Sequence, residues 1–326
     1  MRWLLIPMVL LLAGCSTPPT PPAPTPPLSF TGFQSEWSDP SAMDASAEAI
    51  TVLAVDGLNV LPEGGGLTEP NPDVTTLLDR AHAAGLDAEL MVGNFSSEID
   101  DFDEQRAFDT LSSPAARAGV IATLSTIVER DGWDGISIDL ESLAPRDADG
   151  LTAFATELRE ELAPYKSISI ALMLGDPAER GTDLEALVPV IDRFILMAYD
   201  EHGPWDAASP GPVGSLDWQR AGLEVLLDHV PADQVELGVA GYGYGWGPSG
   251  DGQLSVERAK DLAGDDARFD EAAGEWTAQL DDGTELWWSD IRSFRLRVEM
   301  ARDAGIAGVA LWSLEQGDPI TPADLE

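Results

Sequence analysis

The sequence predicts an α/β fold of the (β/α)₈ class, a TIM barrel with one small insertion. Short runs of apolar and β-branched residues alternate with segments whose apolar residues recur at helical spacing, a pattern typical of parallel strands joined by helices. Eight such strands fit into residues 30–326, the usual size of one closed barrel. An open doubly wound sheet is the alternative, but no GxGxxG motif follows the first strand. The predicted strands cover residues 50–55, 86–92, 135–140, 168–172, 194–198, 235–239, 285–288 and 308–311.

The helical segments between these strands each present one apolar face. Residues 74–84, 120–128 and 151–162 all have apolar side chains three or four positions apart. The segment 247–282 does not follow the alternation and is rich in Gly, Asp and Ala. We expect it to form an insertion between the sixth and seventh strands, made of one helix and a small hairpin. The hairpin would turn at Asp281-Asp282-Gly283.

Residues 1–15 are interpreted as a lipoprotein signal peptide. Arg2 precedes a nearly apolar run, residues 4–12, which is too short to span a bilayer comfortably. The run ends in Leu12-Ala13-Gly14-Cys15, which resembles the cleavage box of bacterial lipoproteins. Because Cys15 is the only cysteine, we expect lipidation there, and hence an exported lipoprotein on a cell-envelope membrane. An ordinary signal peptide with an incidental cysteine is the alternative.

Residues 16–29 form the predicted linker between this anchor and the barrel. Seven of the eleven residues from Thr17 to Pro27 are proline, which excludes helix and favours extended polyproline II. At ~3.1 Å per residue the run is a semi-rigid spacer of roughly 35 Å. We expect residues 30–326 to form the barrel domain.

The overall charge and the histidine pattern exclude several classes of partner. The chain has 18 Lys+Arg against 58 Asp+Glu, a formal net charge of −40, so nucleic acid is not an expected partner. The three histidines are scattered, without metal-ligand spacing, and we expect no metal and no cofactor. We expect the protein to act as a monomer.

The segment from residue 131 to residue 141 carries the predicted chemistry. Side chains alternate along a strand, so Ser137, Asp139 and Glu141 would point into the barrel at its C-terminal end, where barrel active sites lie. Neighbouring carboxylates drive their pKa values apart, and one then keeps a proton near neutral pH, as acid-catalysed glycoside cleavage requires. An acidic strand end at the surface is the alternative. We expect the hydroxyl of Ser137 to donate a hydrogen bond to Asp139.

This segment resembles the DxxDxDxE signature of glycoside hydrolase family 18, the family of chitinases and related N-acetylglucosaminidases. Asp134, Asp139 and Glu141 match, whereas Ser137 stands where the family usually has a second Asp. The resemblance extends over about residues 50–319 and is strongest to the bacterial spore-germination and cortex-lytic branch. The further stretches that carry it are Met197-Ala-Tyr-Asp200, residues 199–205, 210–213, 238–243 and 285–290, and Gly308-Val-Ala-Leu-Trp312.

The resemblance implies a retaining mechanism in which the substrate's own acetamido group is the nucleophile. By motif, Glu141 would be the general acid and base, Asp139 would orient the acetamido group, and Tyr199 would donate a hydrogen bond to it. The implied sugar-binding residues are Asp200, Tyr242 and Trp312. We also expect Asn94, at the end of the second strand, to reach the site.

The implied substrate is a polymer containing β-linked N-acetylglucosamine, of peptidoglycan or chitin type. Two alternatives stay open at this point. One is a lectin-like lipoprotein that binds carbohydrate on the same barrel without turnover, and the other is a scaffold that binds a protein partner. The presence of Glu141 favours the enzyme.

Overall fold

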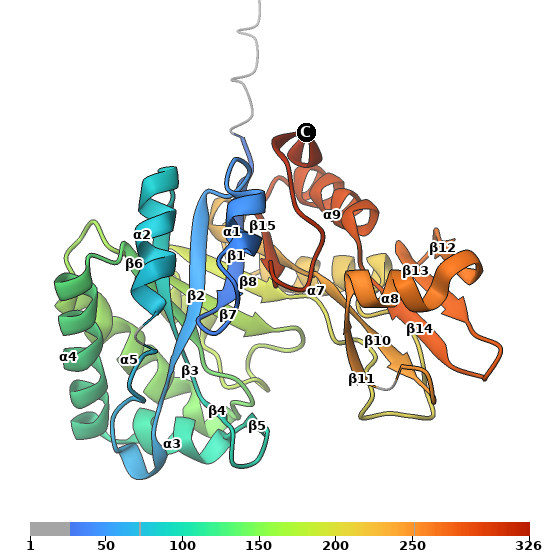
Figure 1. Cartoon of the computed structure of the whole chain (residues 1–326). Helices are drawn as coiled ribbons and strands as arrows, with labels where there is room; N and C mark the ends of the chain where they lie inside the picture. The colour runs from blue at the N-terminus through green and yellow to red at the C-terminus, as the bar shows by residue number, and fades with distance from the viewer. Residues whose placement is uncertain (1–26, 72, 251) are drawn as a thin grey trace, which may run out of the picture.

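The computed structural model describes residues 27–71, 73–250 and 252–326. Eight parallel strands in this part of the chain close into a barrel, in the order β1, β15, β9, β8, β7, β6, β3 and β2 (Figure 1). Their bounds are β1 Ser29–Ser35, β2 Val52–Asn59, β3 Asp87–Gly93, β6 Gly135–Asp139, β7 Ser167–Met173, β8 Arg193–Met197, β9 Val235–Ala240 and β15 Gly308–Trp312. The predicted (β/α)₈ class is confirmed. The predicted signal peptide, Cys15 and most of the linker lie outside the described residues.

Helices connect the strands and cover the outside of the barrel (Figure 1). Three of them end at glycines in the left-handed region, Gly85 with φ 80°, Gly132 with φ 91° and Gly305 with φ 67°, where a side chain would be strained. The helices between barrel strands are α1 Ser41–Ser46, α2 Val74–Ala84, α3 Glu104–Ser112, α4 Pro114–Asp131, α5 Ala148–Glu161, α6 Leu184–Leu187, α7 Leu216–Leu227 and α9 Ile291–Ala304.

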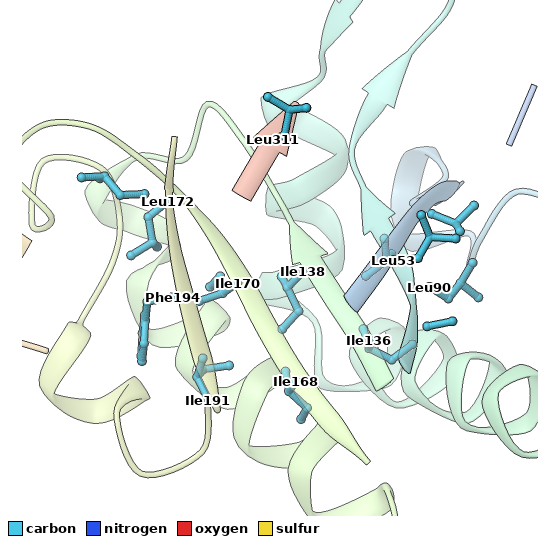
Figure 2. Close-up of a cluster of buried hydrophobic side chains, with 14 of the residues drawn as sticks. Leu53, Leu90, Ile136, Ile138, Ile168, Ile170, Leu172, Ile191, Phe194 and Leu311 are labelled. Atoms are coloured by element: carbon cyan, nitrogen blue, oxygen red, sulfur yellow. The ribbon is translucent and has the colours of Figure 1, made fainter. Parts of the chain in front are cut away.

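The main core lies between the strands and the helices. Every other strand residue points outward into this layer, and Figure 2 shows Ile136 and Ile138 of β6 beside Ile168 and Ile170 of β7, all of them buried. The alternation therefore turns Ser137 and Asp139 toward the barrel interior, as the sequence predicts. Below the site, a small apolar cluster fills the interior: Phe33, Ala54, Met91, Ile195 and Ala310, with Trp312 packed against it.

The first barrel strand is β1, which the sequence prediction missed. The predicted strands begin at residue 50, and the predicted linker runs to Ser29, the first residue of β1. The apolar pattern of this strand is interrupted by Thr31 and Gln34, so it does not predict a strand. Both are fully buried, and Thr31 Oγ1 donates a hydrogen bond of 2.7 Å to Glu236 on β9 inside the barrel. A buried polar side chain is tolerated when it has a hydrogen-bond partner. The local sequence pattern gives no sign of that partner when it lies on a distant strand.

The predicted strand at residues 285–288 is wrong as a barrel strand. These residues form β14 Glu285–Trp288, which pairs antiparallel with β10 Tyr242–Trp246 and β13 Glu275–Gln279. A short apolar run does not distinguish a parallel barrel strand from an antiparallel one.

The insertion is therefore larger than predicted, and it follows β9, the seventh barrel strand. It is a five-stranded antiparallel sheet in the order β11, β10, β14, β13, β12, beside helix α8 (Figure 1). The predicted helix and the turn at Asp281-Asp282-Gly283 are both present, the turn joining β13 to β14. The remaining bounds are β11 Gly252–Ser255, α8 Val256–Ala263 and β12 Arg268–Asp270.

A buried arginine ties the insertion to the barrel. Arg297 of α9 is fully buried and donates hydrogen bonds to Gln219 Oε1 of α7 at 2.8 Å and to the carbonyl of Gly274 beside β13. Glu275 of β13 accepts from the backbone amides of Val213 and Gly214, at 2.8 and 3.0 Å. The loop after β8 is thereby fixed between the two parts.

No single helix in the described ranges has both the length and the apolar composition to cross a membrane. The consecutive pair α3 and α4, bent by 100° at the break between them, meets both criteria together.

Candidate active site

A pocket of about 260 Å³ opens at the C-terminal ends of the barrel strands. Among its lining residues are five that the sequence predicts for the site, and they come from three different strand ends: Asp139, Glu141, Tyr199, Asp200 and Trp312. Apolar side chains from inside the barrel, among them Phe33 and Met91, line its lower part. The pocket thus places carboxylates and a phenol above an apolar floor.

Glu141 lies two residues beyond β6, and Asn94 holds its backbone in place. The amide N–H of Glu141 donates to Asn94 Oδ1 at 2.8 Å, and Asn94 Nδ2 donates to the Glu141 carbonyl at 3.0 Å. The same Nδ2 also donates to the carbonyl of Asp103 at 3.1 Å. Asn94 is fully buried and does not line the pocket, so its side chain contacts the backbone of Glu141 and not the open site. It positions Glu141 instead.

Burial raises the pKa of Glu141 well above its ordinary value, and the nearby carboxylates of Asp139, Asp200 and Asp101 raise it further. The side chain therefore keeps its proton at neutral pH. Burial also raises the pKa of Asp139, and the charge of Asp56 adds to that effect. Asp139 Oδ1 is buried and has no hydrogen-bond partner among the described residues. Asp139 also lines the pocket, so its carboxyl group can meet a donor on a bound molecule.

Asp200 follows Tyr199 after β8, and two tyrosines from the insertion hold its carboxylate. Tyr242 and Tyr244 on β10 both donate to Asp200 Oδ1, at 2.6 and 2.9 Å. Burial raises the pKa of Asp200, and these two hydrogen bonds lower it. Burial keeps the pKa of Tyr199 far above its usual range, so that its hydroxyl remains a donor. The insertion thus shapes one side of the site.

Tyr242 was expected to line the pocket, but it is not among the residues that do so. Its side chain is buried, and its ring packs edge to face on Tyr199, with 6.2 Å between the ring centroids. It acts on the site through Tyr199 and Asp200. Trp312, in contrast, lies in the pocket wall as expected, with its ring 5.8 Å from that of Phe33.

The expected hydrogen bond from Ser137 to Asp139 is absent. Ser137 is fully buried, and its hydroxyl has no partner among the described residues. The strand register instead places another carboxyl group at this height: Asp56 of β2 is level with Met91 of β3, and Met91 is level with Ser137. A carboxyl group therefore stands at the height of Ser137, but it comes from β2. Its charge raises the pKa of Asp139.

Burial and a neighbouring carboxyl group both raise the pKa of Asp56. Burial raises the pKa of Asp56 to about 6, and the charge of Glu315 beyond β15 adds to the rise. Glu36, after β1, is a further neighbour, and its carboxylate accepts the Asn71 amide at 2.8 Å. Asp56 does not line the pocket, so it acts through Asp139 and not on a bound molecule.

We expect Asp56→Asn to move the acid limb of the kcat/KM profile to lower pH. The negative charge of Asp56 opposes ionisation of Asp139, so its removal lowers the pKa of Asp139. Ser137→Asp adds a second charge at the same height and should move the limb to higher pH. Glu36→Gln is the matched control, since Glu36 neighbours Asp56 but not Asp139. Superimposable acid limbs for all four proteins would contradict the coupling of Asp56 to Asp139.

Comparison with known proteins identifies the family. Residues 81–317 match the model of "Glycosyl hydrolases family 18". The chain belongs to this family. The glycosylase YdhD of Bacillus subtilis (strain 168) is 26% identical over 245 residues, which cover 70% of this chain and 56% of YdhD. The cortical fragment-lytic enzyme of the same organism is 22% identical over 268 residues, 74% of this chain and 60% of that enzyme.

These relatives agree with the predicted resemblance, including its spore-lytic branch, and the chain spans less than two thirds of the length of either. The crystal structure of a chitinase from Chromobacterium violaceum ATCC 12472 superimposes with a TM-score of 0.80 at 24% identity. The superposition covers 91% of this chain and 98% of the chitinase. It supports the barrel fold.

The structure adds pocket residues that the sequence does not reveal. Phe102, on the short strand β5 Asp101–Phe102, and Trp218 of α7 both line the pocket, as does Arg180 in the loop after β7. Asp56 could have been suspected as a single carboxylate in an otherwise apolar strand. Nothing in the local sequence around Arg180 distinguishes it from a surface residue.

Proposed function

We propose that the protein is a glycosidase that hydrolyses a polymer containing β-linked N-acetylglucosamine, with Glu141 as general acid and base. The observation that carries the proposal is the pair of pocket carboxyls, Glu141 and Asp139. Burial and the charge of Asp139 keep Glu141 protonated at neutral pH, as a proton donor to a leaving oxygen must be. A module that only binds sugar has no need of such a group.

The proposed mechanism is substrate-assisted and retaining. The acetamido oxygen of the bound sugar attacks the anomeric carbon, while Glu141 protonates the leaving glycosidic oxygen. Asp139, in the pocket wall, accepts a hydrogen bond from the acetamido N–H and stabilises the positive charge of the cyclic intermediate. Tyr199 donates to the acetamido oxygen. Glu141 then removes a proton from water, which opens the ring with retained configuration.

The test is a product assay with the purified protein. Purified peptidoglycan and N-acetylglucosamine oligomers are incubated with it, and new reducing ends are measured. The proposal expects reducing ends from at least one of the two. Binding to either polymer without any release of reducing ends would favour the lectin-like alternative.

We also propose that Cys15 carries a lipid and holds the barrel at an extracytoplasmic membrane face. The motif Leu12-Ala13-Gly14-Cys15, the single cysteine and the proline-rich spacer support this location. We expect Cys15→Ala to move the protein from the membrane fraction to the soluble fraction on cell fractionation. Ser16→Ala is the matched control. A Cys15→Ala variant as firmly membrane-bound as its parent would exclude lipid anchoring at this residue.

A further inference from the structure

Arg180 has an unusual place in this acidic protein. It is the one cationic residue that lines the pocket in the described part of the chain, and it lies between β7 and α6. Acidic residues outnumber basic ones by 58 to 18, yet no carboxylate of the described ranges lies within 4.0 Å of its guanidinium. Other arginines, such as Arg117 with Glu157, are paired. The charge of Arg180 is therefore free to act on a bound molecule.

The loop that carries Arg180 is compact, so the position of the residue is defined. The amide of Arg180 donates to the carbonyls of Asp176 and Pro177, at 3.1 and 3.2 Å, and Thr182 Oγ1 donates to the carbonyl of Arg180 at 3.3 Å. Gly175 has φ 140°, and a Cβ there would lie 3.1 Å from Arg180 Nε. The guanidinium thus packs on bare backbone.

The other side of this loop packs close to the residues that follow Glu141. A Cβ on Gly181 would lie only 2.3 Å from the carbonyl oxygen of Ala144, three residues beyond Glu141. Arg180 and Glu141 line one pocket, so a group bound by Arg180 belongs to the sugar in the pocket or to its neighbour.

The charges of the pocket limit which substrates it accepts. Asp139 and Asp200 line it, and the whole chain carries a formal net charge of −40, which repels an anionic glycan. A neutral glycan would need no cation at this place. A glycan with a carboxylate would need one, and the planar fork of an arginine binds a carboxylate through two parallel hydrogen bonds.

We propose that Arg180 binds a carboxylate of the substrate, so that the preferred polymer is an N-acetylated glycan with carboxylate-bearing sugars, of the muramic acid type. The inference rests on the proposed glycosidase function and gives its substrate class. Two parts of such a polymer can supply the carboxylate. One is the lactyl ether on the sugar itself, and the other is the end of a peptide attached to it.

The experiment compares Arg180→Gln, Arg180→Lys and the parent on four substrates. These are neutral N-acetylglucosamine oligomers, peptide-free alternating N-acetylglucosamine–N-acetylmuramic acid oligomers, the same oligomers with the lactyl carboxylate amidated, and oligomers that keep their peptides. Arg258→Gln is the matched control, because Arg258 on α8 also has no carboxylate within 4.0 Å among the described residues but does not line the pocket. Thermal unfolding of each variant checks the fold, and no loss is expected because the Arg180 side chain makes no hydrogen bond there.

We expect Arg180→Gln to lower kcat/KM on the carboxylate oligomers by roughly 10- to 100-fold, the usual effect of a lost charge-assisted pair. On neutral oligomers it should change kcat/KM by less than about twofold, and Arg180→Lys should recover only part of the loss. Loss on peptide-free oligomers, abolished by amidation, identifies the lactyl carboxylate. Loss confined to peptide-bearing oligomers identifies the peptide.

A binding measurement keeps this inference separate from the proposed function. In the Glu141→Gln background, titration calorimetry with the same oligomers reports affinity without turnover. Arg180→Gln should weaken binding of the carboxylate oligomers alone. Equal effects on neutral and anionic oligomers, or no effect on either, would overturn the assignment of Arg180. If the parent protein cleaves none of the oligomers but still binds the carboxylate oligomers selectively, the proposed glycosidase function is overturned. Arg180 would then remain assigned as the carboxylate-binding residue.

Discussion

Glu141→Gln is expected to lower kcat by roughly 10²–10⁴-fold, the usual contribution of general acid–base catalysis. Glutamine keeps the shape of the side chain but has no proton to transfer. The contacts to Asn94 use only the backbone of residue 141, so they persist in the variant. The pocket should therefore keep its form, and KM or Kd for oligosaccharides should change little.

The measurement is single-turnover and steady-state hydrolysis, together with calorimetric binding of an oligosaccharide. Glu98→Gln is the control, since the Glu98 side chain is 82% exposed, pairs only loosely with Arg106 at 3.4 Å and does not line the pocket. The parent should also lose activity at high pH, as Glu141 gives up its proton. Turnover by Glu141→Gln within a few-fold of the parent would remove Glu141 from the role of acid.

The sequence predicts the central part of this fold because apolar and polar residues alternate regularly along β6. Ile136 and Ile138 face the helices, and Ser137 and Asp139 face the interior, so strict alternation places the carboxylates correctly. In β1 the pattern fails, because buried Thr31 is satisfied by Glu236, more than two hundred residues away. Such long-range satisfaction of a polar group leaves no local signal, and the strand was missed for that reason.

The same limit applies to the site. Residues of one motif, such as Asp139 and Glu141, could be assigned from their spacing, because side chains two positions apart on a strand point to the same face. The role of Asn94 depends on the loop of residue 141 meeting the end of β3, and the role of Asp56 depends on the register of three strands. Closure of the barrel sets these relations, and they cannot be obtained from one segment alone.

Removal of the acetamido group from the sugar at the cleaved position is expected to abolish hydrolysis almost completely. In the proposed mechanism the acetamido oxygen is the nucleophile, and well-placed intramolecular nucleophiles reach effective molarities of roughly 10⁵–10⁸ M, so a loss of at least about 10³-fold is expected. Glu141 is protonated and cannot take over as the nucleophile, and hydrogen bonds from Tyr242 and Tyr244 hold the carboxylate of Asp200.

The choice of substrate analogue decides the value of this test. A free amine in place of the acetamido group would be cationic and would be attracted by Asp139 and Asp200, so binding and chemistry would change together. An analogue with a 2-hydroxyl group removes the nucleophile and the N–H donor without adding a charge. The matched control carries the same hydroxyl on a sugar away from the cleaved bond, and it should be hydrolysed at nearly the rate of the full substrate.

The stereochemistry of the first product completes the argument. Two successive displacements at the anomeric carbon, first by the acetamido oxygen and then by water, return the original configuration. Proton NMR of the reaction in its first minutes, before mutarotation, should therefore show the β-anomer. Asp139→Asn should slow the formation of this product strongly without changing its configuration, because the amide no longer stabilises the charged ring. An inverted first product, or hydrolysis of the 2-hydroxyl analogue at the parent rate, would exclude the acetamido nucleophile and assign direct attack by water.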